Sequence, residues 1–364
     1  MTKQVYVIGD IHGRLDLLKQ SLKLARIIDK NSNWQRENIL LIQLGDVIDR
    51  GPQSLQVVLY FQKLKKQAKY FNSDIEILLG NHELMALFAG MGNNYAKFHW
   101  YFNGGDAVYS EWNQGPDPLE SKPLAKLPQK FYDQFSLNGN FGKVISQYKA
   151  AVKYKKNLFV HGGIVNEKRS IDEINKKVQQ TITSQNKEAY QKDLFNKTGP
   201  FWARNFTEKS LKDQCLRYNI NRQIVGHTPK VGLEISNDGT LVYADLGMNQ
   251  NHLPFILSLE EKYIRLKTKC RQHKQLLASE GCIKIVSREK SYPFTRPKFK
   301  PGDLIDLFST DDSRFYVQFK VLSINTEKII WYIGEFIYYE NGKKTIKPGK
   351  WPIGHIDKHG IKAE

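Results

Sequence analysis

A layered α/β fold, with central β-sheets flanked by helices, is predicted by three features of this 364-residue sequence. Short apolar runs recur, glycine-containing turns with polar residues follow them, and amphipathic helices follow the first three turns. Units of strand, turn and helix build layered α/β folds, in which sites form beyond the carboxyl ends of the strands. The predicted strands are 4–8, 39–44, 75–79, 158–160, 223–225 and 240–244, and the predicted helices are 15–28, 54–66 and 83–88.

The length of the chain favours two domains. We predict a catalytic domain over 1–259, because the strand-and-turn pattern ends there. The remaining part, 260–364, is interpreted as a charged linker followed by a small, mostly-β module. Segments 92–150 and 166–198 interrupt the pattern of the first domain and are interpreted as insertions that cap or border a cleft. The alternative is that they are packed insertions without a role in substrate binding.

The formal net charge of +18 would attract anionic partners such as phosphorylated proteins, nucleotides, nucleic acid or acidic membrane surfaces. A lysine-rich solvated surface without any partner explains the same charge. No apolar run approaches the roughly 20 residues of a membrane helix, so the only membrane contact compatible with the sequence is peripheral. The three widely spaced cysteines make neither a disulfide framework nor a metal clip, and a strand over 5–8 leaves no room for a secretory signal. A reducing, cytoplasmic location is therefore predicted.

Five short motifs follow five of the predicted strands, and glycine in each of them lets the backbone turn sharply. Together they hold three Asp, four His and one Asn. Carboxylate, imidazole and amide groups in combination suit Mn, Fe or Zn, whereas the absence of thiolates argues against a structural zinc site. Side chains that follow separate strands can converge at one metal centre. The motifs are Gly9-Asp10-Ile11-His12-Gly13, Gly45-Asp46-Val47-Ile48-Asp49-Arg50-Gly51, Gly80-Asn81-His82-Glu83, His161-Gly162-Gly163 and Gly226-His227-Thr228.

This set of motifs resembles the phosphoprotein phosphatase (PPP) family of calcineurin-like metallophosphoesterases, whose motif order it follows over residues 5–259. The resemblance implies the metallophosphoesterase fold and two divalent metal ions, with Mn favoured and Fe or Zn as alternatives. Two such ions can lower the pKa of a bridging water, which then attacks the phosphorus in line as hydroxide. The implied ligands are Asp10, His12 and Asp46 for the first metal, and Asp46, Asn81, His161 and His227 for the second, so that Asp46 bridges the pair.

The resemblance also implies roles for residues around the metals. Arg50 would hold phosphoryl oxygens, because a guanidinium matches phosphate and stays charged. His82 would protonate the leaving oxygen, with Asp49 orienting its imidazole. Arg204, in Trp202-Ala203-Arg204, matches the second phosphate-binding arginine of the family. Glu83 and Asp245 are expected to buttress the site or cap backbone groups. Four further histidines have no motif context and are not expected to be ligands: His99, His252, His355 and His359.

Departures from the eukaryotic pattern indicate a bacterial or bacteriophage-like branch. Leu79 stands where eukaryotic protein phosphatases place an arginine, and Leu84-Met85 is typical of bacterial members. The segment Trp100-Tyr101-Phe102-Asn103-Gly104-Gly105 resembles the Asn-Gly-Gly segment of bacterial and bacteriophage members. The length, the Lys-, Asn- and Ile-rich composition and the appended module also resemble the Wip-type effector phosphatases that bacteria inject into host cells, which would place the protein in the host cytoplasm.

The leading functional hypothesis is a protein phosphatase for phosphoserine and phosphothreonine, with a partner protein recruited through the C-terminal module. A phosphotyrosine phosphatase with the same site is the nearest alternative. A cysteine-based mechanism is disfavoured, because six residues rather than five separate Cys215 from Arg222. A symmetrical dinucleoside tetraphosphatase shares the motifs, and its polyanionic substrate would suit the positive charge. A basic nucleic-acid-binding protein is the least favoured, because relics of metal sites tend to lose ligands and this chain keeps the full set.

Overall fold

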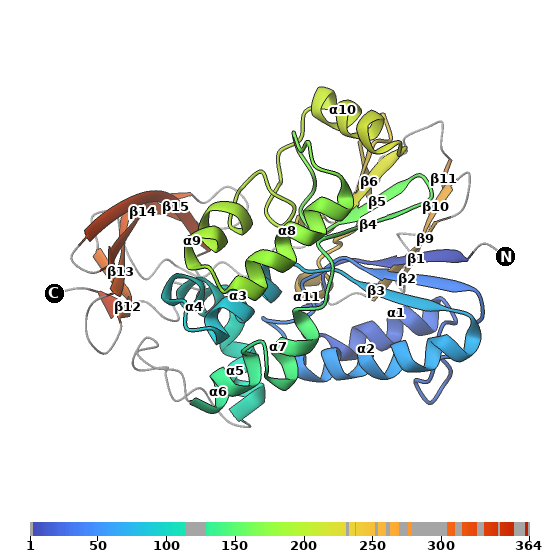
Figure 1. Ribbon diagram of the computed structural model, residues 1–364, viewed down its shortest axis with the longest axis horizontal. Helices are drawn as coiled ribbons and strands as arrows, with labels where there is room; N and C mark the ends of the chain where they lie inside the picture. Colours follow the sequence, from blue (N-terminus) through green and yellow to red (C-terminus); the bar gives the residue numbers. More distant parts are fainter. Residues whose placement is uncertain are drawn as a thin grey trace. The chain divides into compact units, whose positions relative to one another are not determined.

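The computed structural model describes most of the first 278 residues and five strands of the C-terminal part. The described ranges are 3–113, 129–230, 233–236, 238–251, 254–259, 263–268, 276–278, 304–309, 315–325, 331–340, 343–352 and 361–362. The chain divides into two compact units, the first within 1–114 and 133–287 and the second within 115–132 and 288–364. The first unit contains two sheets with helices packed against them, which confirms the predicted layered α/β fold (Figure 1).

The first sheet has the strand order β11-β10-β9-β1-β2-β3. Its parallel strands β1 and β2 are apolar along almost their whole length, as expected for strands covered on both faces, whereas the edge strand β3 alternates acidic and apolar residues. In the register of the first pair, Gln4 lies opposite Ile39 and Ile8 opposite Gln43. The strands are β1 (Gln4–Ile8), β2 (Ile39–Gln43) and β3 (Asp74–Ile77), which are parallel, followed on the other edge by the antiparallel β9 (Phe255–Leu259), β10 (Tyr263–Thr268) and β11 (Leu276–Ala278).

The second sheet has the order β4-β5-β6-β8-β7, and its inner strands β5, β6 and β8 are parallel. All six predicted strands are therefore present, with ends that differ by one or two residues. Parallel strands within each sheet end at the same edge, which brings the five motifs to one region of the fold. The strands of the second sheet are β4 (Ala151–Tyr154), β5 (Asn157–Val160), β6 (Arg222–Val225), β7 (Glu234–Ile235) and β8 (Leu241–Tyr243).

Helices cover these sheets on the sides seen in Figure 1, with α1 and α2 below the first sheet and α10 above the second. Helix α1 (Leu15–Leu24) packs against β9 and β10, and α2 (Ser54–Ala68) packs against β3. The predicted helix over 15–28 is too long, because the chain turns at Arg26 with a left-handed φ of 57°. Conversely, α3 (Asn81–Gly90) begins two residues before its predicted start, so the motif residue Asn81 lies in its first turn.

The two insertions are largely helical. Segment 92–150 forms α4 (Asn94–Trp100), the π-helix η2 (Tyr101–Gly105), α5 (Asp106–Asn113), α6 (Gln129–Phe135) and α7 (Asn140–Ile145), and its residues 114–128 lie outside the described part of the chain. Segment 166–198 forms α8 (Ile171–Ser184), α9 (Lys187–Ala189) and the π-helix η3 (Tyr190–Leu194). The remaining helices are η1 (Lys69–Phe71), α10 (Glu208–Tyr218) and α11 (Met248–Asn251).

The second unit contains one antiparallel sheet with the order β15-β14-β13-β12-β16, in agreement with the predicted mostly-β module. Its strands are β12 (Leu304–Ser309), β13 (Phe315–Asn325), β14 (Trp331–Glu340), β15 (Lys343–Pro352) and β16 (Ile361–Lys362). The domain boundary at residue 259 stays a prediction, and β10 and β11 extend the first sheet beyond it. In the described part of the chain, no helix combines the length and the apolar character needed to cross a membrane.

Candidate active site

The six predicted metal ligands come together where the parallel strands end. Each of these residues is at most 4% exposed. Such deep burial of carboxylates and imidazoles is costly unless each group finds a partner of opposite charge or a metal ion. The six are Asp10 and His12 after β1, Asp46 after β2, Asn81 at the start of α3, His161 after β5 and His227 after β6.

Several residues of this region hold a left-handed backbone conformation although they are not glycine. Such a conformation brings Cβ close to the backbone and costs on the order of 1–3 kcal/mol per residue. It persists because neighbouring loops hold it; for example, the backbone N–H groups of Ile11 and His12 both donate to the Asp46 carbonyl at 3.0 Å. Strain gathered in one place is typical of a functional site. The residues are His12 (φ 48°), Asp46 (φ 55°), Asp49 (φ 71°), Arg50 (φ 66°) and His227 (φ 62°).

Two buried residues tie these loops together. Glu83 accepts hydrogen bonds from the backbone N–H groups of Gly80 and Asp46, each at 2.8 Å, and from those of the next two residues after Asp46. This confirms the predicted buttressing role of Glu83. Gln43, which the sequence reading missed, donates to the Gly9 and Gly45 carbonyls and accepts from the Gly45 N–H. A lone polar residue at the end of an apolar strand was the signal that could have identified it.

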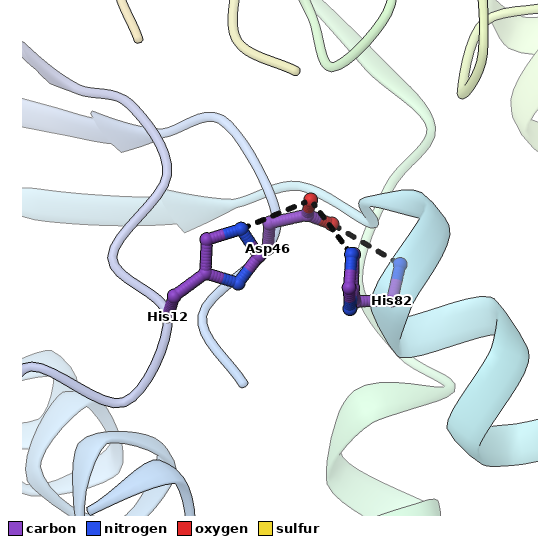
Figure 2. A group of neighbouring side chains, drawn as sticks. All are labelled: His12, Asp46 and His82. Atoms are coloured by element: carbon purple, nitrogen blue, oxygen red, sulfur yellow. Dashed lines mark hydrogen bonds and ion pairs between the residues drawn. The ribbon is translucent and has the colours of Figure 1, made fainter. Parts of the chain in front are cut away.

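Figure 2 shows the first cluster, which we define as His12 and Asp46, from the loops after β1 and β2, and His82, from the first turn of α3. His12 Nε2 lies 3.7 Å and His82 Nε2 lies 3.8 Å from Asp46 Oδ2. The backbone N–H of His82 also donates to Asp46 Oδ1 at 3.1 Å. One potential ligand atom from each residue lies within 4.8 Å of the others.

The second cluster is Asp46, His161 and His227, which meets the same distance criterion. His161 Nε2 lies 3.4 Å from Asp46 Oδ1 and 2.9 Å from Asn81 Oδ1. Both of these oxygens are acceptors, so the nitrogen between them carries either a proton or a cation. The buried His227 Nε2 has no hydrogen-bond partner among the described residues.

The donor set fits divalent metal ions. His12 Nδ1 lies 2.9 Å from the Ile48 carbonyl, so it carries the proton and leaves the Nε2 lone pair facing Asp46. Burial, followed by the nearby Arg50 charge, lowers the pKa of His12 to about 3, which keeps that lone pair available. Burial also holds the pKa of His227 well below its usual value, so its buried Nε2, which has no hydrogen-bond partner among the described residues, keeps its lone pair available. Imidazole lone pairs gathered around a shared carboxylate are what a metal ion requires.

Asp10 adds negative charge beside both clusters. Its Oδ2 lies 4.0 Å from His12 Nε2, and its Oδ1 accepts the His227 backbone N–H at 3.1 Å. Burial and then the charges of Asp245 and Asp46 raise the pKa of Asp10 well above its ordinary value. Burial likewise raises the pKa of Asp245 to about 6, and the carboxylate of this residue caps the Gly247 N–H as predicted. Three carboxyl groups crowded together in this way would be relieved by bound cations.

The predicted phosphate and proton groups lie over the first cluster. Arg50 Nη1 donates to His12 Nε2 at 2.8 Å, and Arg50 Nη2 donates to His82 Nε2 at 3.0 Å. His82 Nδ1 lies 2.6 Å from Asp49 Oδ2, and both of these side chains are buried. Burial lowers the pKa of His82 and raises that of Asp49. The Arg50–His82–Asp49 row therefore runs from an exposed guanidinium to a buried carboxyl group.

Arg204 lies on the side of the second cluster. Its Nη1 donates to Thr228 Oγ1 at 3.4 Å, directly beside the predicted ligand His227. The Trp202 ring packs edge-on against the His227 ring, with centroids 5.7 Å apart. The structure thus brings all ten predicted site residues into one region. Of the four histidines without motif context, His99 lies in α4, and His252, His355 and His359 lie outside the described residues.

Another residue missed by the sequence reading is Trp100. The buried indole Nε1 donates to Asp49 Oδ1 at 3.0 Å. The segment 100–105 stands out in the sequence only as a resemblance to related proteins. Because Asp49 and Trp100 are 51 positions apart, local pattern gives no sign of their contact.

Comparisons with known proteins agree with this geometry. Residues 3–231 match the family described as Metallophos, calcineurin-like phosphoesterase. An uncharacterized protein of Schizosaccharomyces pombe is 30% identical over 266 residues, which cover 67% of this chain and 73% of that protein. Shewanella-like protein phosphatase 1 of Plasmodium berghei is 27% identical over 318 residues, covering 79% and 82% of the two chains. A mutant of a cold-active protein tyrosine phosphatase, of known crystal structure, is 25% identical, covers 73% of this chain and 78% of that one, and has a TM-score of 0.59.

These matches extend across both sheets that carry the motifs. The predicted bacterial or bacteriophage-like branch and the Wip-type resemblance stay predictions. The family match covers 229 of the 364 residues (231 − 3 + 1), and the five motifs converge at one buried site. This chain belongs to the calcineurin-like phosphoesterase family of metallophosphoesterases.

Proposed function

We propose that this protein is a metal-dependent protein phosphatase that hydrolyses phosphoserine and phosphothreonine monoesters. The observation that carries the proposal is that Arg50 and the His82–Asp49 pair lie at the first of two histidine clusters that share Asp46. Guanidinium groups match phosphoryl oxygens, and a carboxylate-oriented imidazole can deliver a proton to a leaving oxygen. The relative named Shewanella-like protein phosphatase 1 supports a phosphoprotein substrate.

Asp10, Asn81 and the members of the two clusters other than His82 would hold the metal ions, and His82 is reserved for proton transfer. In this proposal Asp10, His12 and Asp46 hold one ion, Asp46, Asn81, His161 and His227 hold the other, and Mn is favoured over Fe or Zn. Two divalent ions, when bound, supply Lewis acidity and a lowered pKa for a water between them. The chain's own part is to fix the positions of these ligands. Backbone hydrogen bonds to Glu83 and Gln43 do so, by holding the loops in their left-handed turns.

The remaining steps use protein groups. Arg50 and Arg204 bind the nonbridging phosphoryl oxygens from the two sides of the site. When Arg50 turns its donors to phosphate, the Nε2 atom of His82 is released from its hydrogen bond with Arg50. In its protonated state, His82 then donates the Nε2 proton to the leaving seryl or threonyl oxygen, while Asp49 holds the Nδ1–H and stabilises the imidazolium.

Phosphotyrosine is the second candidate substrate. The related crystal structure is that of a protein described as a tyrosine phosphatase. The chemistry of the site admits both substrates, because the same metal ligands and arginines would bind either phosphate group. The two differ in the leaving group, since a phenol with a pKa of about 10 depends less on protonation than an alcohol does.

The deciding experiment compares manganese-supported phosphate release from phosphoserine, phosphothreonine and phosphotyrosine peptides and from diadenosine tetraphosphate. We expect the first two peptides to be the best substrates and a chelator to abolish turnover. Preference for the tyrosine peptide, or rapid formation of ADP from the dinucleotide, would replace the proposed substrate. Absence of activity on every phosphopeptide with Mn²⁺ would refute a protein phosphatase.

Asp46→Asn is the matched control in this experiment. The shared carboxylate serves both clusters, so its loss should weaken binding of both ions. Losing several kcal/mol of charge stabilisation corresponds to a fall in kcat of roughly 10³-fold or more. Full activity in Asp46→Asn would show that the metal site is misassigned.

Cellular context is a separate proposal. The module over 304–362 is proposed to recruit a partner protein, with a cytoplasmic location, or a host-cell location if the protein is an injected effector. Deletion of this module should preserve turnover of short phosphopeptides and lower turnover of the intact phosphoprotein. Equal turnover of the intact substrate would contradict the partner role.

A further inference from the structure

The Asp49 carboxylate is held at both of its oxygens. Oδ2 lies 2.6 Å from His82 Nδ1, and Oδ1 accepts the Trp100 indole N–H at 3.0 Å. The Asp49 backbone N–H donates to Ser54 Oγ at 2.9 Å. Because one donor contacts each oxygen, the plane of the carboxylate cannot rotate without losing a hydrogen bond in a buried environment. Trp100 therefore fixes the direction in which Asp49 presents its other oxygen to His82.

The fold holds the indole ring firmly. Trp100 is the last residue of α4 and is 0% exposed. A Cβ atom added at Gly105 would overlap the Trp100 ring, so this position of the following π-helix must stay free of a side chain. The carbonyl oxygen of the preceding residue, Gly104, accepts a hydrogen bond from the backbone N–H of Arg50 at 2.8 Å. One short segment, 100–105, thus contacts both the buried end and the exposed end of the Arg50–His82–Asp49 row.

We propose that Trp100 is a positioning residue for leaving-group protonation, which it serves through the hydrogen bond of its indole N–H to Asp49. The inference rests on the proposed role of His82 as the proton donor. Trp100 neither contacts the substrate nor binds metal. It holds Asp49, and Asp49 holds the Nδ1–H of the His82 imidazolium. As the P–O bond breaks, the Nε2 proton of this imidazolium passes to the leaving oxygen and His82 is left as the neutral Nδ1–H tautomer.

The test uses leaving-group dependence, because a role in protonation matters most for poor leaving groups. Trp100→Phe keeps an aromatic ring but removes the N–H. We expect kcat/KM for alkyl phosphates to fall about 10- to 100-fold, and that for p-nitrophenyl phosphate to fall less than about 3-fold. The slope of log kcat/KM against leaving-group pKa should become steeper. If the loss is equal for all leaving groups, Trp100 contributes only to packing and the proposal is wrong.

Two further variants separate the hydrogen bond from the ring. Trp100→His places an imidazole Nε2–H where the indole Nε1–H lies and removes the benzene ring. Its slope against leaving-group pKa should therefore be as shallow as that of the wild type, even if the protein is less stable. Replacement of Trp100 by benzothienylalanine keeps the ring shape and removes only the N–H, so it should reproduce the steep slope in a protein that keeps the packing of the ring. A shallow slope in the benzothienylalanine protein would overturn the proposal.

Trp34→Phe is the matched control. Trp34 is also buried and its Nε1 donates to the Arg36 carbonyl, between α1 and β2 and outside both clusters. This variant should lose stability without any change in the slope. In a His82→Ala background, Trp100→Phe should cause no further leaving-group-dependent loss, because the group it positions is gone. An additional steepening in that background would contradict the proposed path through His82.

A measurement without turnover keeps this inference separate from the proposed function. The Trp100 indole N–H resonance, identified by its disappearance in Trp100→Phe, should shift in Asp49→Asn because the charged acceptor is lost. An unshifted resonance would refute the hydrogen bond itself. If the wild type cleaves aryl and alkyl phosphates but no phosphopeptide, the proposed substrate fails while the leaving-group test of Trp100 still applies.

Discussion

The two clusters share Asp46, but they differ in what faces their histidine nitrogens. In the first cluster, Arg50 donates to the Nε2 atoms of both His12 and His82. In the second cluster, His161 Nε2 faces an amide oxygen and a carboxylate oxygen. The buried His227 Nε2 has no hydrogen-bond partner in the described part of the chain.

This difference indicates which of the two clusters depends more on a metal ion to stabilise its buried polar groups. A guanidinium is a planar cation with several donors, so Arg50 supplies to the first cluster part of what a metal ion would supply. Beside the second cluster, the Arg204 guanidinium donates to Thr228 rather than to a histidine nitrogen. We therefore expect the second cluster to gain more from metal binding. In the first cluster, a metal ion has to compete with Arg50, which is then free to bind phosphate.

Among variants that act on one cluster only, the largest effect is expected for His227→Ala, which removes a predicted ligand from the second cluster. Metal content should fall from two ions to one per chain, and kcat should fall about 10²-fold or more because one charge-stabilising ion is lost. Elemental analysis of the purified protein measures the metal content, and phosphate-release kinetics measure kcat. His99→Gln, at a histidine without a predicted ligand role, should keep two ions. Retention of both ions in His227→Ala would break the assignment of the second cluster.

Arg50→Ala tests the competition in the first cluster. Loss of its charge-assisted hydrogen bonds should weaken inhibition by inorganic phosphate about 10- to 100-fold. Metal affinity, measured by calorimetry, should be unchanged or higher, since the Nε2 atoms of His12 and His82 lose a competing donor. Arg204→Ala should weaken phosphate binding without raising metal affinity, because its guanidinium donates to Thr228 instead. Weaker metal binding in Arg50→Ala would contradict the proposed competition.

The smallest effect concerns the pH dependence of stability in the metal-free protein. The pKa of His12 is lowered to about 3 in the folded state and lies near 6.5 in the unfolded chain. Between these values only the unfolded state binds the proton, so falling pH favours unfolding by about 1.4 kcal/mol per pH unit for this residue. Relative to wild type, His12→Gln should lack this part of the slope between about pH 6 and 4 in chelator-treated samples. Identical slopes would show that His12 is not held neutral.

Much of the fold could be predicted because its signals are local. The apolar run before each motif identifies a strand, and the six predicted strands are present within one or two residues of their expected ends. The end of α1 could not be read in this way. Ile27 and Ile28 continue the helical spacing of apolar residues but are buried in the loop that follows the left-handed turn at Arg26.

The sequence by itself determined the chemistry of the site. Metal-binding and phosphate-binding residue types follow separate strands, and parallel strands of one sheet end at the same edge, so their convergence within each sheet follows from local pattern. The packing of the two sheets brings the two groups of motifs together. Tertiary structure alone decided how those groups are satisfied. Glu83 binds a loop that lies nearly 40 positions away, Arg50 covers two histidines and Trp100 reaches Asp49. These hydrogen bonds join residues distant in sequence, and their geometry exists only after the sheets and the first insertion have packed.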